Sequence, residues 1–338
     1  MGAELRVYRR RIRSVQSTKK ITKAMELIAA SRIAKAQARI DAARPYAEEL
    51  TRALVALGRN ASIRHPLLTG VERPRRAGVL LVTSDRGLAG GYNANAIKAA
   101  NRLCERLSAE GKAPVRYVVG RKGVAYYRFR RVPLAGQWTG FSEQPSFVDA
   151  RAATELVLGA LSATSAGEHR GEAGIDELHL VFTSSRTALH QVPGELLIAP
   201  VGDLAADPGA GATAAPGGAT PAPAGATAAP GAADGPGEAG AAGSGPQPAY
   251  EFEPEAEQLL GTLLPRYISA RIFSALLDSA LAESASRRNA MRSASDNAEE
   301  LIKTYTRLAN EARQAEITQE ISEIIGGTDA LAAASGSE

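Results

Sequence analysis

The chain has one cysteine, Cys104, and one tryptophan in 338 residues, and aromatic residues make up only 5% of it. A single cysteine excludes an internal disulfide and suits a reducing compartment. Few aromatic residues beside 44% hydrophobic content favour closely approaching helices over a large globular interior. The longest near-continuous apolar run, Gly78–Val82, is far too short to cross a bilayer, and we expect no signal peptide.

Residues that would carry catalysis are also scarce. The four histidines, which are scattered without metal-ligand spacing, are His65, His169, His179 and His190. The G-x-S-x-G motif of serine hydrolases does not occur. A glycine-rich turn at residues 85–91 matches neither common phosphate-binding motif, so a sharp turn that needs positive φ explains its glycines better. Asp85 and Asp149 are the best candidate acids, but neither has an identifiable partner. We therefore predict no catalytic residue, no metal site and no cofactor.

Charge is distributed unevenly. The first 23 residues carry eight lysines and arginines against one acid, whereas no lysine or arginine lies between Arg186 and Arg266. A basic helical end is compatible with nucleic acid, acidic lipid or an acidic protein surface, and equally with a solvated helix face. Charge alone does not choose among these.

Two segments, one at each end of the chain, have apolar residues at alternating spacings of three and four. The first set is Ile33, Ala36, Ile40, Ala43, Ala47, Leu50, Leu54 and Leu57; the last is Ala294, Ala298, Leu301, Tyr305, Leu308, Ala312 and Ala315. A sustained repeat of about 3.5 residues keeps one seam facing a partner helix and favours a left-handed supercoil. Since neither helix could bury its stripe alone, we expect the two ends to pack as an antiparallel coiled coil. Pro45 predicts a kink or a two-part first helix.

Between the two seams, strands alternate with helices. Expected strands cover 78–83, 115–119 and 178–182, and residues 191–199 are expected as an edge strand although Pro193 argues against a strand there. Expected helices cover 93–110, 148–161 and a stretch beginning near Arg121. This alternation predicts a small, mostly parallel, Rossmann-like α/β domain. The fold class is therefore α/β plus a long antiparallel coiled coil.

Residues 205–248 consist almost entirely of alanine, glycine, proline and threonine, which predicts a disordered insertion. Helix is expected to resume near Pro254 and to stop at Gly326 and Gly327. The predicted domains are an N-terminal coiled-coil helix at 1–60, an α/β domain at 61–204, the insertion at 205–248, a C-terminal coiled-coil helix at 249–327 and a flexible tail at 328–338.

Four collinear motifs stand out: residues 12–33, IRSVQSTKKITKAMELIAASRI; residues 84–91, SDRGLAGG; residues 250–254, YEFEP; and residues 310–320, NEARQAEITQE. Together they resemble the gamma subunit of F-type ATP synthase. The first resembles its N-terminal signature, the second the turn after its first strand, the third the segment that leads into its last helix, and the fourth its C-terminal signature. The resemblance covers nearly the whole chain except the insertion, and the composition resembles that of high-GC bacteria such as the actinobacteria.

The resemblance implies a central-stalk rotor subunit that performs no catalysis itself. Its two terminal helices would turn inside the ring of alternating alpha and beta subunits, and the α/β domain would sit at the foot, against the epsilon subunit and the membrane c-ring. Rotation of the ring, driven by protons, would then cycle the catalytic beta subunits for ATP synthesis. One copy per hetero-oligomer, peripheral at the cytoplasmic face of the plasma membrane, is expected.

The resemblance also implies partner-binding residues. Those expected to contact beta subunits are Lys23, Met25, Arg32, Arg313, Gln314 and Thr318; those expected at the rotor ring or epsilon are Tyr250, Phe252 and Glu253. For Met25, an ordinary seam position is a competing interpretation. Ile317, Ile321, Ile324 and Ile325 would either turn in a hydrophobic sleeve or pack onto the first helix.

Two other classes of function compete with this interpretation. A nucleic-acid-binding coiled coil accounts for the basic end, but no base-reading element accompanies it. A nucleotide-dependent enzyme accounts only for the α/β centre and its glycines. The gamma-subunit interpretation covers both seams and all four motifs, with no nucleic acid as partner.

Overall fold

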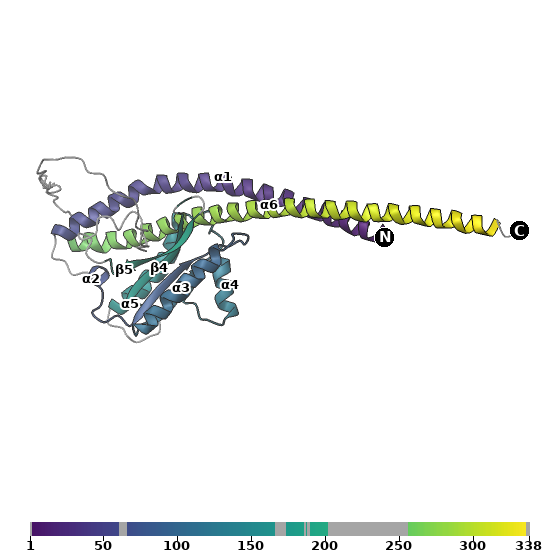
Figure 1. The fold of residues 1–338 in the computed structure, drawn as a ribbon. Coiled ribbons are helices and arrows are strands. Elements are labelled where there is room, and N and C mark those ends of the chain that lie inside the picture. Colours follow the sequence, from purple (N-terminus) through teal and green to yellow (C-terminus); the bar gives the residue numbers. More distant parts are fainter. Residues whose placement is uncertain are drawn as a thin grey trace, which may run out of the picture.

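The computed structural model describes residues 2–60, 66–165, 174–185, 187, 190–201 and 256–335. Two long helices, α1 (Gly2–Asn60) and α6 (Ala256–Ser335), lie side by side and carry a compact α/β domain on one flank (Figure 1). The insertion predicted at 205–248 lies outside the described residues, as do Tyr250, Phe252 and Glu253.

Contacts along α1 and α6 establish that the two helices run in opposite directions. Tyr8 near the start of α1 lies against Tyr305, with ring centroids 6.5 Å apart. Further along α1, the Thr22 and Ser295 hydroxyls lie 2.7 Å apart and are buried. At its far end, Leu54 joins a cluster with Leu260 and Leu264. Residue numbers therefore rise along α1 as they fall along its neighbour, as Figure 1 also shows.

The predicted seam of α1 is confirmed, because each of its eight residues is buried or half-buried while their neighbours are mostly exposed. The predicted seam of α6 is wrong at two places. Leu301 is exposed, and Ile302 takes its position in the seam; Ala315 is exposed too. The reason is a step of four residues from Ala298 where the repeat predicted three. Because a helix has 3.6 residues per turn, a step of four in place of three moves the contact with α1 to the next residue, from Leu301 to Ile302.

Pro45 does not split α1, which continues as one helix of 59 residues. Proline removes one backbone donor, but at this exposed position the freed carbonyl can be hydrated, so the cost is tolerated. In the same half α1 bends away from α6 (Figure 1). A cleft of about 940 Å³ opens there, lined among others by Ile40, Ala47, Phe273 and Asp278. The separation explains why the middle of the α1 seam is only half-buried.

The predicted helix stop at Gly326 and Gly327 is wrong, since α6 continues to Ser335, and residues 328–335 are helical where a loose tail was expected. One glycine costs a helix only about 1 kcal/mol relative to alanine. A stop also needs a left-handed residue and capping bonds, and the alanines that follow are strong helix formers. Composition at one dipeptide was therefore too weak a signal.

The α/β domain has a five-stranded sheet in the order β3-β2-β1-β4-β5. Its strands are β1 (Arg76–Val82), β2 (Ala113–Val119), β3 (Gly136–Trp138), β4 (Glu177–Ser185) and β5 (Gln191–Ala199). All neighbours pair in parallel except β4 and β5, which are antiparallel. The mostly parallel sheet is confirmed, as is the edge position of β5. Proline has no backbone N–H, and an edge strand tolerates Pro193 because one side of the strand has no neighbour to bond.

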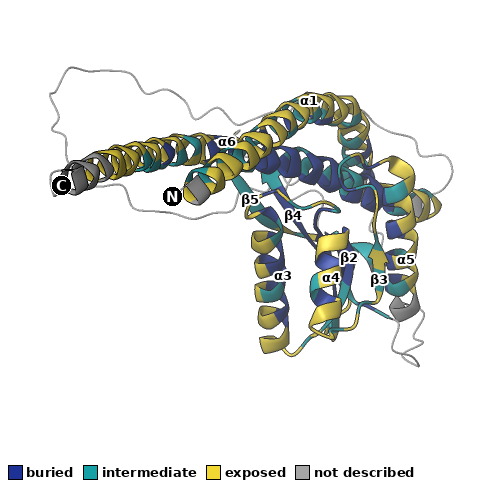
Figure 2. Cartoon of the chain, turned by 90° about the vertical axis from the view of Figure 1, so that its right-hand side faces the viewer, coloured by how far each residue is buried: buried dark blue, intermediate teal, exposed yellow. Residues whose placement is uncertain are grey.

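Helices cover both faces of this sheet. They are α3 (Tyr92–Ala109), α4 (Arg121–Phe129) and α5 (Phe147–Ser165), with α2 (Pro66–Thr69) in the connector after α1. One core lies between the sheet and α3 with α4; the other lies between the sheet and α5 with the middle of α6. Figure 2 shows that this middle part of α6 is buried whereas its C-terminal half is mostly exposed. The sequence missed β3 and α2, because three or four residues carry too little periodicity to detect.

The end of the helix pair offers a direct test of packing. Leu54 is fully buried between the helices, whereas Leu27 on the same helix is 63% exposed. We expect Leu54→Ala to lower the free energy of unfolding of the full chain by about 3 kcal/mol, through lost burial plus a cavity. The matched control Leu27→Ala should cost less than about 0.5 kcal/mol. Urea denaturation measures both, and equal losses would contradict the arrangement of α1 on α6.

Candidate functional sites: the domain–helix junction and the tip of α6

The α/β domain meets the two long helices at the carboxyl ends of β1 and β3. Two loops converge there, residues 83–91 after β1 and residues 139–146 after β3. They are tied together by Asp85, which accepts hydrogen bonds from the backbone amides of Gly140 at 2.7 Å and Ser142 at 3.0 Å. The Ser142 hydroxyl in turn accepts from the Asp85 amide at 2.8 Å. Asp85 therefore has a structural role and is not free to act as an acid or base.

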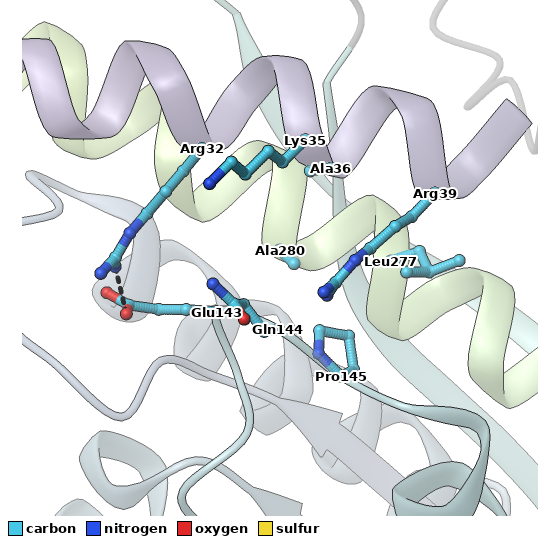
Figure 3. Close-up of a pocket in the computed structure, with 9 residues that line it drawn as sticks. All are labelled: Arg32, Lys35, Ala36, Arg39, Glu143, Gln144, Pro145, Leu277 and Ala280. Atoms are coloured by element: carbon cyan, nitrogen blue, oxygen red, sulfur yellow. Dashed lines mark ion pairs between the residues drawn. The ribbon is translucent and has the colours of Figure 1, made fainter.

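Glu143 in the second loop is the centre of this junction. Its carboxylate pairs with Arg32 of α1, drawn in Figure 3, and lies 3.1 Å from Nη1 of Arg287 on α6. Arg86 of the first loop approaches it at 3.7 Å. One carboxylate thus contacts cations from α1, α6 and the loop after β1, so it holds the domain against both long helices.

Arg287 is the most deeply buried cation of the junction, with 5% of its side chain exposed. Its Nη2 lies 2.7 Å from Oε1 of Glu283, and the guanidinium donates to the Gly87 carbonyl at 3.3 and 3.4 Å. Burial raises the pKa of Glu283, although Arg287 acts in the opposite direction. A carboxylate buried this deeply is retained because a paired guanidinium compensates it.

The glycine-rich turn is part of the same junction. Leu88 and Gly90 have positive φ, at 62° and 54°, so the predicted sharp turn is confirmed. The prediction assigned positive φ to glycines alone, whereas Leu88 also adopts the left-handed conformation. The turn presents its Arg86 and Gly87 carbonyls to Arg287, and Asn93 accepts from the Ser84 amide at 2.9 Å. These contacts pack the turn against α6 and do not form a cradle for phosphate.

The other candidate groups are also structural. Asp149 accepts from the Ser146 amide at 2.8 Å and forms a capping box at the start of α5. His179 in β4 lies 3.3 Å from Glu177, and Cys104 is buried, which raises the pKa of its thiol. Among the described residues, no group of three histidine, cysteine or acidic side chains could hold a metal ion.

A small cleft of about 10 Å³ lies beside Glu143, between α1 and the loop after β3 (Figure 3). Lys35 and Arg39 of α1 line it together with Gln144 and Pro145. A space of this size holds about one water molecule. It is therefore a packing gap in the junction and not a ligand site.

The second candidate site is the tip of α6, which extends past the start of α1 (Figure 1). Arg313, Gln314 and Thr318 are exposed there, and the Thr318 hydroxyl donates to the Gln314 carbonyl at 2.9 Å. The four tip isoleucines are 45–67% exposed; they are Ile317, Ile321, Ile324 and Ile325. Packing onto the first helix is therefore excluded for these isoleucines, because the described part of α1 ends before it reaches them.

The predicted contacts in the N-terminal signature separate in space. Lys23 is exposed and pairs with Glu26 at 3.0 Å, and Met25 is half-buried at the edge of the seam. Arg32 lies at the junction instead, paired with Glu143. Sequence reasoning missed Glu143, Glu283 and Arg287, although the spacing of four between the last two on one helix was a readable signal.

These features define a class of proteins in which an α/β domain is inserted between two long terminal helices that pack on each other. Residues 4–331 match the family model described as ATP synthase. The chain belongs to this family, and its relatives are gamma chains. It is 53% identical to the ATP synthase gamma chain of Salinispora tropica and 52% identical to that of Parafrankia sp., with at least 98% of each chain covered.

Solved structures of similar fold come from mitochondrial ATP synthases. One is from Euglena gracilis, with a TM-score of 0.59, 14% identity, and 98% of this chain and 95% of that chain covered. Another is the central stalk and c-ring of Tetrahymena thermophila, with a TM-score of 0.52, 22% identity, and 81% and 99% covered. The gamma-subunit interpretation is confirmed, and the nucleic-acid-binding alternative gains no support. No helix in the described ranges is long and apolar enough to span a membrane.

Proposed function

We propose that this chain is the rotating central stalk of a proton-translocating ATP synthase. In this proposal α1 and α6 form an antiparallel coiled coil that turns inside the ring of alpha and beta subunits. The observation that carries the proposal is the 80-residue α6, whose tip extends beyond α1 with its apolar side chains exposed. A single bare helix with an apolar surface suits a sleeve formed by other subunits.

The Rossmann-like α/β domain would form the foot, where torque from the membrane ring enters. Torque reaches α1 and α6 only if the domain cannot turn against them. Hydrophobic packing of Ile268, Ile272 and Leu276 on the sheet and the ion cluster around Glu143 both resist such movement. We infer that the chain contributes this coupling and no catalysis, and that each orientation of the shaft stabilises a different state of each beta subunit.

The partner contacts follow from the family. The residues that would face the beta subunits are Lys23, Met25, Arg32, Arg313, Gln314 and Thr318. Arg32 would make this contact while it stays paired with Glu143. Tyr250, Phe252 and Glu253 would touch the rotor ring or epsilon. The complex would hold one copy of this chain, peripheral at the cytoplasmic face of the plasma membrane.

The tip contacts can be tested in the assembled complex. We expect Arg313→Ala/Gln314→Ala to lower ATP turnover by about tenfold or to impair assembly, because a guanidinium fork facing acidic partners is a strong anchor. The matched control is Lys303→Ala/Thr304→Ala, two exposed residues in the part of α6 that α1 covers. Full coupled activity in the first variant would refute the tip contacts.

The proposal as a whole has a simpler test. The native chain is purified by affinity, and the proteins that accompany it are identified. Alpha, beta and epsilon subunits with ATPase activity are the expected result. A chain that purifies without a hexameric ATPase, or with nucleic acid instead, would contradict the proposal.

A further inference from the structure

The end of α4 exposes an aromatic ring among cations. Phe129 is 89% exposed, more than any other large hydrophobic side chain of the described residues. Arg128, Arg130 and Arg131 flank it and are exposed as well. We call these four residues the α4 tip. One exposed apolar side chain is ordinary on a protein surface, so the argument depends on what surrounds it.

The chain around the α4 tip carries charge of one sign only. Residues 111–142 contain seven lysines and arginines and no aspartate or glutamate. Within the described residues, no ion pair joins the arginines of the α4 tip to a carboxylate. Arg128 donates to the Gln137 side chain at 3.3 Å, and the Arg130 guanidinium stands 5.0 Å from the centroid of the Tyr126 ring. Both contacts orient these cations without neutralising them.

The backbone holds an arginine where glycine is the usual residue. The Arg131 amide donates to the Arg128 carbonyl and the Val132 amide to the Tyr127 carbonyl, both at 3.0 Å, and Arg131 has φ of 56°. This is a Schellman motif with its left-handed position at Arg131. The same motif ends α3, and there glycine, Gly111 at φ 82°, takes that position.

A side chain at a left-handed position strains the backbone, so Arg131 occupies this position at a local cost in free energy. The free energy gained when the Arg131 guanidinium, beside Phe129, binds a partner would offset this backbone strain. A binding partner would have to combine negative charge with an apolar recess for the ring.

The position of α4 favours a protein over a lipid surface. In Figure 1 α4 lies on the side of the domain that faces the C-terminal end of α6, away from the end where α1 stops and α6 begins. Under the proposed function, on which this step rests, that latter end faces the membrane ring. The α4 tip then lies on a side of the domain that does not face the membrane ring.

We propose that the α4 tip is a docking surface for an acidic protein segment of a subunit beside the stalk, with Phe129 in an apolar recess of that partner. The arginines would pair with carboxylates around the recess. Fully desolvated pairs at the centre of a contact contribute more than those at its rim.

The test is site-directed photocrosslinking in the assembled complex. Benzoylphenylalanine replaces Phe129, and it replaces Val148 in a control, since Val148 is an exposed apolar residue on α5. We expect position 129 to crosslink to a segment rich in aspartate and glutamate on another subunit. The double variant Arg130→Gln/Arg131→Gln should lower the yield by about tenfold, whereas Arg73→Gln/Arg75→Gln, two exposed cations before β1, should leave it unchanged.

Each other outcome counts against the docking surface. A lipid or nucleic-acid product at position 129, a crosslink to a segment without acidic residues, or no product in an intact complex would overturn it. A yield that does not respond to the arginine variants would overturn the role of charge. Failure of the chain to assemble with an ATPase would instead refute the proposed function, so the two failures are distinguishable.

Discussion

Replacing Gly120 by alanine is expected to lower the free energy of unfolding by at least about 4 kcal/mol, or to prevent soluble expression. Gly120 links β2 to α4 with φ of 97°. A Cβ there would lie 2.1 Å from the backbone carbonyl oxygen of Thr83, which is buried at the end of β1. Neither backbone can move away easily, because the Thr83 amide and hydroxyl both donate to the Val119 carbonyl, at 2.8 and 2.7 Å.

The control is Gly111→Ala. Gly111 also has positive φ, 82°, but nothing lies within 4 Å of an added Cβ. This variant should cost only about 1 kcal/mol, the strain of a left-handed backbone alone. Urea unfolding of the two full-length variants separates strain from collision. Equal losses would mean that β1 and β2 move apart at little cost.

Removing the charge of Glu143 is the second change with a large expected effect. Glu143→Gln keeps the size of the side chain but leaves Arg287, which is almost fully buried, with Glu283 as its remaining carboxylate. Breaking a buried ion pair on one side costs about 3 kcal/mol, because the other charge stays buried. We expect a loss of that size in urea denaturation, with faster hydrogen exchange around Arg32.

A surface pair provides the matched control. Glu195 pairs with Arg106 at 2.6 Å, but more than half of that arginine is exposed. Glu195→Gln should therefore cost less than about 1 kcal/mol. If Glu143→Gln were as mild as this control, hydrophobic packing alone would fix the domain on α1 and α6.

Long periodic elements could be predicted from the sequence. The seam of α1 is buried or half-buried over its whole predicted length, and the strands at 78–83, 115–119 and 178–182 appear in the structure within a few residues. Repeats of this length average over local exceptions such as Pro45. Short elements such as β3, and the continuation of α6 past its glycine pair, could not be predicted, because a few residues carry little propensity in sum.

The sequence by itself determined the two amphipathic ends, the parallel α/β centre and the resemblance to gamma subunits, since each depends on spacing along one chain. Only the tertiary structure decided the roles of Glu143, Arg32 and Arg287, which are distant in sequence and come from three separate elements. It also decided that the tip isoleucines lie beyond α1. The physical reason is the same in both cases. Periodicity is local, whereas the pairing of buried charges and the stagger of two helices depend on how distant segments meet.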